Sequence, residues 1–283
     1  MTSFSWIAGV RGEIVAAGKR LEAVAYGPGP AEAPTILMLH EGLGCVALWR
    51  DFPQKLAAAT GWGVFAYSRA GYGASESVDL PRPLDYMSRE ARESLPAVID
   101  AIGLKRGILL GHSDGASIAA IYAGEHSDER ILGLVLMAPH LFTEEGGLAS
   151  IAEARLAYET GDLRAKLAKY HAHADVAFRG WNGAWLDPRF KAWNIEDAVW
   201  RWRVPALVIQ GVDDQYGTLA QVRAIEERSS APVESLILKA CRHSPQFDQP
   251  EAALRAIAGF CANLAGSASG LRDRRSGSHQ SGS

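Results

Sequence analysis

Cysteine is scarce in this chain of 283 residues, and a disulfide framework cannot be drawn from it. The three cysteines, Cys45, Cys241 and Cys261, are an odd number, which suits a protein of a reducing compartment. A basic excess is also lacking, because the formal net charge is −3 at pH 7. Such a charge provides no field for holding nucleic acid or an anionic membrane, so neither partner is expected.

Long apolar runs are missing as well, since no stretch approaches the roughly 20 residues that a membrane span requires. The first six residues, Met1 to Trp6, lack the basic segment followed by an apolar one that marks a secretory signal. We therefore expect a cytoplasmic enzyme or binding protein that acts away from membranes. The sequence leaves open whether it forms a homodimer.

Apolar residues are plentiful, and their spacing predicts the fold class. Hydrophobic residues make up 48% of the chain, so a sizeable core can form. Continuous apolar runs of strand length alternate with segments of helical period, which is typical of a doubly wound, mostly parallel α/β sheet of eight strands. Strands are predicted at 12–16, 21–26, 36–40, 63–67, 107–111, 131–138, 205–210 and 236–239. Helices are predicted at 49–59, 84–102, 113–126, 219–229 and 250–264.

The segment 140–203 interrupts this alternation. It has a helical pattern without a buried strand and holds five of the eight tryptophans. We interpret it as a helical lid inserted after the sixth strand. The α/β core then comprises 1–139 and 204–265, and the Gly/Ser/Arg-rich segment 266–283 is predicted to be a disordered tail.

A candidate nucleophile follows the predicted strand at 107–111. Gly111-His112-Ser113-Asp114-Gly115 matches G-x-S-x-G, and a helical pattern starts directly behind it. Glycines on both sides of Ser113 permit the sharp strand-to-helix turn that raises a serine hydroxyl above a sheet. The start of the following helix then favours negative charge near that hydroxyl.

A serine nucleophile requires a base and an orienting acid, and both types of residue follow along the chain. Asp213 and Asp214 come directly after the strand at 205–210, and His243 follows the last predicted strand. We favour Asp214 as the acid, with Asp213 as a helix cap. An oxyanion hole would use the amide of Asp114 and that of either Gly42 or Leu43, in the glycine-rich loop after the third strand.

These motifs resemble the α/β-hydrolase fold family of serine hydrolases over residues 10 to 264, in particular its lidded esterases and carbon–carbon bond hydrolases. In that family the acid stands three residues after the glycine at the strand end, which supports Asp214. This chain differs from the family pattern at two positions. Glu41 separates the histidine and the glycine of the usual His-Gly in the oxyanion loop, and Ser68 stands after the fourth strand, where the family often has Asp.

The resemblance implies an enzyme with a Ser113–His243–Asp214 triad that needs no metal or organic cofactor. It hydrolyses a carboxylic ester or related acyl bond of a small, partly aromatic substrate through an acyl-enzyme. Cleavage of a carbon–carbon bond in a vinylogous diketone, or of a thioester or lactone, is the alternative. The lid residues Trp181, Trp185 and Arg179 are predicted to contact the substrate.

Two other classes of function are less consistent with the sequence. The segment 42–47 fits the dinucleotide pattern G-x-G-x-x-A, and Ser68-Arg69 could hold a 2′-phosphate. That interpretation leaves all three triad residues unexplained. A ligand receptor that has kept the fold without turnover would be expected to have lost a catalytic group. His171 and His173 are not expected to bind a metal, because helix positions i and i+2 point about 200° apart.

Overall fold

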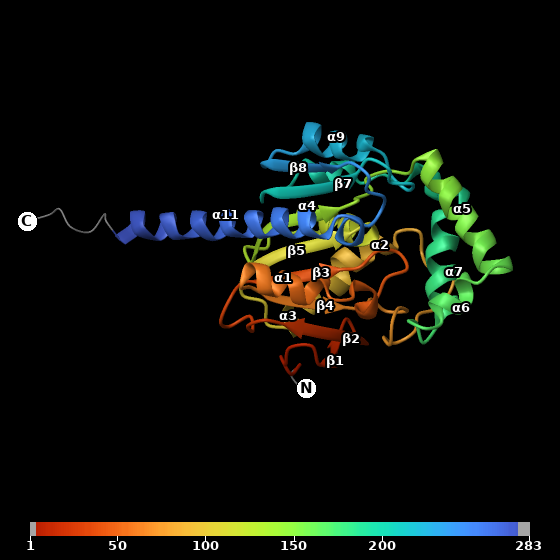
Figure 1. Ribbon diagram of the computed structural model, residues 1–283, viewed down its shortest axis with the longest axis horizontal. Coiled ribbons are helices and arrows are strands. Elements are labelled where there is room, and N and C mark those ends of the chain that lie inside the picture. Colours follow the sequence, from red (N-terminus) through yellow and green to blue (C-terminus); the bar gives the residue numbers. More distant parts are fainter. Residues whose placement is uncertain (1–3, 277–283) are drawn as a thin grey trace, which may run out of the picture.

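The computed structural model describes residues 4–276, and one eight-stranded sheet forms its centre (Figure 1). The strand order is β1-β2-β4-β3-β5-β6-β7-β8. β1 and β2 form an antiparallel hairpin, β2 is also antiparallel to β4, and every other neighbouring pair is parallel. The predicted α/β class with a mostly parallel eight-stranded sheet is confirmed. The strands are β1 Arg11–Ala16, β2 Lys19–Tyr26, β3 Thr35–Leu39, β4 Gly63–Tyr67, β5 Gly107–His112, β6 Ile131–Met137, β7 Ala206–Gly211 and β8 Val233–Leu238.

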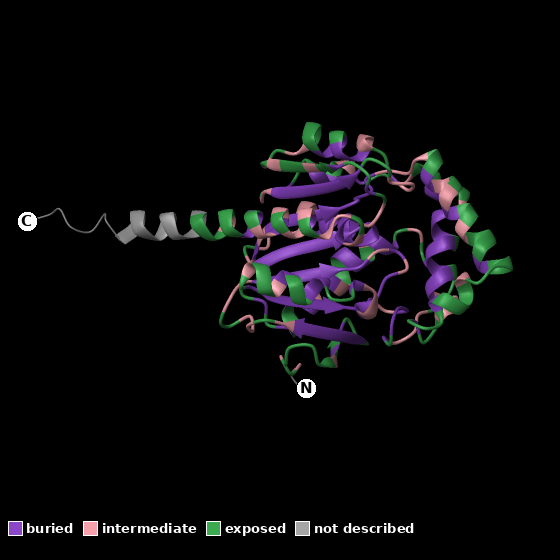
Figure 2. Cartoon of the chain, in the orientation of Figure 1, coloured by how far each residue is buried: buried purple, intermediate pink, exposed green. Residues whose placement is uncertain are grey.

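Helices cover both faces of the sheet, which explains why the central strands are apolar without interruption. Leu37 and Leu39 of β3 face the side packed by α3 and α4, whereas Ile36 and Met38 face α1 and α11. The strands are accordingly buried along their lengths (Figure 2). The helices outside the lid are α1 Phe52–Thr60, α2 Tyr86–Arg89, α3 Leu95–Ala101, α4 Asp114–Glu125, α9 Leu219–Arg228, α10 Pro245–Asp248 and α11 Pro250–Ser276. A short 3-10 helix η1, Val46–Trp49, precedes α1, and the π-helical turn η2, Glu90–Ser94, separates α2 from α3.

The helical insertion follows β6, as predicted, and stands beyond the carboxyl ends of the parallel strands (Figure 1). It comprises α5 Glu145–Thr160, α6 Leu163–Leu167, α7 Ala174–Trp185, the 3-10 helix η3 Pro188–Ala192 and α8 Glu196–Val199. His171, just before α7, ties the insertion to the core. Its Nδ1 accepts the N–H of Gly73 at 2.9 Å, and its Nε2 lies 2.9 Å from the carbonyl oxygen of Leu43.

Several predicted boundaries shift by one to three residues, and the differences at β8 and α11 have a physical explanation. β8 begins at Val233, earlier than the predicted 236, because this edge strand is exposed at several positions and lacks a continuous apolar run. α11 continues to Ser276, past the predicted helix end at 264 and through the start of the predicted tail. A glycine inside a helix costs about 1 kcal/mol, which weakens the helix without ending it. The rest of the predicted tail, 277–283, lies outside the described residues.

Among the helices of residues 4–276, none has both the length and the apolar character that membrane crossing requires.

Candidate active site

Ser113 occupies a sharp turn between β5 and α4. Its backbone has φ 53° and ψ −118°, an unusual conformation for a residue other than glycine. The flanking glycines are required by close backbone approach, since a Cβ at Gly111 would overlap Gly115 and one at Gly115 would overlap Leu39. The turn is held in place by the Ser113 N–H, which donates to the carbonyl oxygen of Met137 at 2.9 Å. This is the strand–turn–helix geometry that the sequence motif predicts.

Asp214 and His243 meet above the carboxyl end of β7. His243 Nδ1 lies 2.8 Å and 2.9 Å from the two carboxylate oxygens of Asp214. Because a carboxylate only accepts, Nδ1 carries the proton, and Nε2 of a neutral ring keeps its lone pair. The Asp214 side chain is 1% exposed, so the contact is shielded from water.

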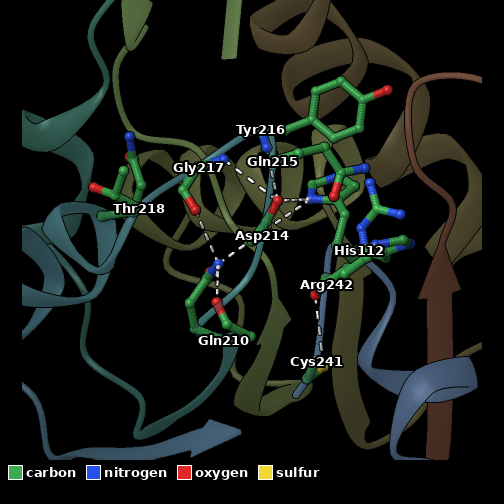
Figure 3. A network of polar contacts seen from close by, with 12 residues as sticks. His112, Gln210, Asp214, Gln215, Tyr216, Gly217, Thr218, Cys241 and Arg242 are labelled. Carbon is green, nitrogen blue, oxygen red and sulfur yellow. Dashed lines mark hydrogen bonds and ion pairs between the residues drawn. The ribbon is translucent and has the colours of Figure 1, made fainter. Parts of the chain in front are cut away.

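Three further donors hold the Asp214 carboxylate (Figure 3). Gln210 Nε2 donates to it at 2.8 Å, the backbone N–H of Tyr216 at 2.8 Å and that of Gly217 at 3.4 Å. Burial by itself would raise the pKa of this carboxyl, but the hydrogen bond from His243 and the backbone amide outweigh it and lower the pKa to about 2. Asp214 is therefore ionised at neutral pH.

Asp213 does not take part in this arrangement, and neither aspartate caps a helix. Asp213 is exposed, and its backbone N–H donates to the carbonyl oxygen of Cys241 at 2.9 Å. The predicted capping role is wrong, because Thr218 is the N-cap of α9 and its hydroxyl accepts the N–H of Ala220. The turn after β7 is long enough that the helix starts beyond both aspartates.

The oxyanion loop after β3 distinguishes between the two predicted donors. The carboxylate of Glu41 accepts the backbone N–H of Leu43 and so occupies that amide. Within residues 4–276 the backbone N–H groups of Gly42 and Asp114 donate no hydrogen bond. The Glu41 side chain thus folds the loop around a local turn that leaves the Gly42 amide free.

Arg69 and His40 fix this loop from below. Arg69 is fully buried and its guanidinium donates to the carbonyl oxygens of His40, at 2.5 Å, and of Glu41, at 3.2 Å. The ring of His40 in turn accepts the backbone N–H of Arg69 at 3.0 Å. Because Arg69 is enclosed and used by the loop, it is not available for the phosphate that a dinucleotide site would hold.

A small cavity of about 70 Å³ contains Ser113. Ser113 and His243 share its wall with the oxyanion loop and with two tryptophans of α7, Trp181 and Trp185. The full lining is Glu41, Gly42, Leu43, Ser113, Asp114, His140, Ile151, Trp181, Trp185, Tyr216 and His243. The cavity wall thus includes Ser113, His243, the three predicted oxyanion residues and both predicted tryptophans, and Asp214 lies behind it, bonded to His243.

Arg179 is not part of this cavity. Its side chain is 70% exposed and lies 3.9 Å from Asp175 on the outer side of α7. Trp181 and Trp185 are four residues apart and share one face of the helix, whereas Arg179 is two residues from Trp181 and points the opposite way. The prediction that Arg179 contacts the substrate therefore lacks support from its position.

Trp185 links the lid directly to the elbow. Its indole Nε1 lies 3.2 Å from a carboxylate oxygen of Asp114 and 3.0 Å from the hydroxyl of Tyr86. The Tyr86 hydroxyl donates to the same carboxylate. Burial raises the pKa of Asp114, while Arg69, 3.9 Å away, opposes that rise. Polar partners from α2, from α7 and from the loop after β4 thus enclose the Asp114 side chain.

Sequence reasoning missed three residues of the cavity wall: His140, Ile151 and Tyr216. His140 is 5% exposed, and its ring lies 5.7 Å from that of His243 and 5.3 Å from that of Trp185. Burial lowers the pKa of His140 to about 4, so its ring is neutral near pH 7. Its position just after β6 at the sheet edge was the one signal that could have identified it.

The amino-acid sequence of this chain matches a known protein family. The alpha/beta hydrolase fold family matches residues 34–179, about half of the chain. The chain belongs to the α/β-hydrolase fold family. Epoxide hydrolase B of Mycobacterium tuberculosis is 31% identical over 118 residues, which are 42% of this chain and 32% of that protein. The match thus spans about a third of the length of this α/β-hydrolase relative.

Solved structures share the fold at low sequence identity. A bacterial membrane phospholipase A superposes with a TM-score of 0.71 at 19% identity, covering 90% of this chain and 86% of that one. The enol-lactonase of Burkholderia xenovorans superposes with a TM-score of 0.67 at 20% identity, covering 89% of this chain and 100% of that one. These similarities concern the α/β-hydrolase fold alone.

Proposed function

We propose that this α/β hydrolase cleaves a carboxylic ester or a related acyl bond of a small substrate through an acyl-enzyme. The observation that carries the proposal is the placement of Ser113, in its strained turn, in one cavity with a His243 ring oriented by Asp214. Nε2 of His243 takes the proton of the Ser113 hydroxyl as it attacks the carbonyl. The amides of Gly42 and Asp114 hold the resulting oxyanion, while Leu43 is engaged by Glu41.

The second half of the reaction uses the same groups. His243 gives its proton to the leaving group and then activates the water that attacks the acyl-enzyme. Asp214 stays ionised throughout and stabilises the imidazolium form of His243. The cavity at Ser113 has a volume of about 70 Å³, which suits a small acyl part.

Epoxide opening, the activity named for one relative, receives less support. Epoxide opening in this fold uses a carboxylate nucleophile, whereas the residue at the elbow here, with φ 53°, is Ser113. The neighbouring carboxylate of Asp114 is bound by Tyr86 and Trp185. The related carbon–carbon, thioester and lactone cleavages use the same triad and are separated by assay.

The test combines one variant with one label. Ser113→Ala should lose turnover of acetyl esters while keeping its melting temperature within a few degrees, because the hydroxyl makes no hydrogen bond within residues 4–276. A fluorophosphonate should label the wild-type chain once, on the peptide that holds Ser113, and should not label the variant. Turnover by Ser113→Ala above a few per cent of wild type, or labelling on another peptide, would refute the proposal. A panel of esters, thioesters, lactones and ring-fission diketones then ranks the substrate classes.

A further inference from the structure

A second histidine stands on the wall of the Ser113 cavity and is not used by the proposed mechanism. Among the described residues, His140 and His243 are the histidines of this wall, and only His243 acts as the base. His140 follows β6 and is 5% exposed. Its ring contacts the ring of His243 on one side and that of Trp185 on the other. The imidazole of His140 thus lies beside the reacting centre, between the base and the lid.

The two ring nitrogens of His140 have no hydrogen-bond partner within residues 4–276. Neither of them is among the unpaired polar atoms that the protein seals off from water, so both border space that a group of the size of water can enter. The cavity whose wall the ring forms is the one that contains Ser113. Because buried polar groups are nearly always hydrogen-bonded in native proteins, this ring indicates a polar ligand group in that cavity.

The surrounding chain holds the His140 ring in place. Its carbonyl oxygen accepts the hydroxyl of Ser117 at 2.6 Å, and the N–H of Leu141 donates to Gln221 Oε1 at 2.7 Å. A Cβ on Gly217 would lie 3.1 Å from His140 Cε1 and 3.3 Å from Nδ1, so the backbone of Gly217 packs directly against this edge of the ring. A ligand group that bonds to the ring therefore meets a preorganised partner, which reduces the entropic cost of binding.

The charges around the cavity favour a neutral polar group. The described residues place no lysine or arginine on the cavity wall, so a substrate carboxylate would meet no cation there. Burial lowers the pKa of His140 to about 4, and the ring is therefore neutral near pH 7. A neutral imidazole has one N–H donor and one lone-pair acceptor. A hydroxyl can both donate and accept, so it matches this ring in either tautomer.

We propose that His140 determines specificity by hydrogen bonding to a hydroxyl on the acyl part of the substrate. The inference rests on the proposed acyl transfer and extends it to a substrate class, the esters of small 2-hydroxy acids. During that reaction the carbonyl carbon is bonded to Ser113, and the cavity of about 70 Å³ holds a short acyl chain. The hydroxyl that bonds to His140 therefore stands on the carbon next to the carbonyl. It stays attached throughout, so the reaction gains no further step.

Two esters of almost equal shape test this inference. Ethyl glycolate has a hydroxyl where ethyl propionate has a methyl group. Each kcat/KM is divided by the rate constant for alkaline hydrolysis of the same ester, because the hydroxyl also activates the carbonyl. We expect the corrected kcat/KM to be about tenfold or more higher for the glycolate, since the methyl group leaves the buried imidazole unpaired. Equal corrected values for the two esters would overturn the inference.

Variants of His140 assign the preference to its ring nitrogens. His140→Phe keeps an aromatic ring but removes both nitrogens, so it should abolish the preference for the glycolate, whatever it does to the absolute rates. His140→Gln keeps a donor and an acceptor and should retain part of the preference. His126→Phe makes the same change at a histidine that stacks on Tyr122, outside the cavity wall, and should keep the wild-type ratio. If His140→Phe lowers kcat/KM for both esters by one common factor, the ring does not recognise the acyl hydroxyl.

Binding without turnover separates this inference from the proposed function. Glycolamide and propionamide carry the same two acyl groups on an amide, and the Ser113→Ala protein lacks the nucleophile. Ligand-observed NMR on that protein should give tighter binding of glycolamide, and adding His140→Phe should remove the difference. If glycolamide is preferred but the wild type hydrolyses no ester, the assignment of His140 stands and the ester hydrolysis fails. If the wild type hydrolyses esters and neither the esters nor the amides show the preference, the assignment of His140 fails alone.

Discussion

Replacing Asp214 by Asn tests the core of the proposed mechanism, because it changes one atom in a fully bonded site. The carboxylate accepts hydrogen bonds from His243, Gln210 and the backbone amides of Tyr216 and Gly217. An asparagine oxygen can still accept from the backbone amides. Its NH₂ group then faces donors, so either the Gln210 amide turns over or His243 takes the tautomer with the proton on Nε2. The second response removes the base.

Asp214→Asn is expected to lower both kcat and the free energy of unfolding. Without the orienting carboxylate, kcat should fall by on the order of 10⁴. The pKa of Asp214 is lowered from 3.8 to about 2 in the folded chain, and each unit corresponds to 1.36 kcal/mol. The ionised carboxylate therefore contributes about 2 kcal/mol to the free energy of unfolding above pH 4. Since a depressed carboxyl pKa stabilises only the ionised form, this contribution disappears as the pH falls from about 4 to 2.

Steady-state kinetics on an acetyl ester and urea unfolding at pH 7 and pH 3 measure both quantities. Asp213→Asn is the matched control, because Asp213 is exposed and its side chain makes no hydrogen bond or ion pair within residues 4–276. We expect Asp213→Asn to keep kcat within twofold and the free energy of unfolding within about 0.5 kcal/mol. If Asp214→Asn keeps its kcat, or if Asp213→Asn loses it, the assignment of the acid is wrong.

Three further changes have defined outcomes. Thr218→Ala should lower the free energy of unfolding by about 1 kcal/mol in urea denaturation without changing kcat, because it removes the α9 cap; unchanged unfolding would exclude the cap. Trp185→Phe replaces the indole on the cavity wall by a smaller ring, so kcat/KM should fall more for a bulky aromatic ester than for an acetyl ester. A common factor for both would mean that Trp185 acts through its bond to Asp114 or through stability, without contacting the substrate. Gly42→Ala should lower kcat on every ester by on the order of 10-fold or more, because its Cβ would overlap Trp181 and shift a donor of the proposed oxyanion hole. If the variant keeps the wild-type kcat, Gly42 is not an oxyanion donor.

The strongest sequence predictions were local ones. Glycines at 111 and 115 around Ser113, with a strand before and a helix after, predicted the strained elbow, because the turn itself brings Gly111 against the backbone of Gly115. The approach of Leu39 to Gly115 comes from the neighbouring strand β3 and was not predicted. The apolar runs likewise predicted the sheet, since strands covered on both faces have no polar side. The position of Asp214 relative to the strand-end glycine predicted its contact with His243.

What the sequence could not decide depends on contacts between distant segments. The proposed choice of Gly42 over Leu43 rests on the hydrogen bond between the Leu43 amide and the Glu41 carboxylate, which no spacing rule gives. The Gln246 side chain of α10 likewise lies 3.2 Å from the His112 ring, a residue 134 positions away in the chain. Arg179 and Trp181 are close in sequence, yet the packing of α7 leaves Arg179 at the surface and places Trp181 on the wall of the cavity that contains Ser113. The sequence by itself determined which segments become strands, helices and the elbow. Only the tertiary structure decided which polar atoms are paired, because each pairing follows from the packing of elements that lie far apart along the chain.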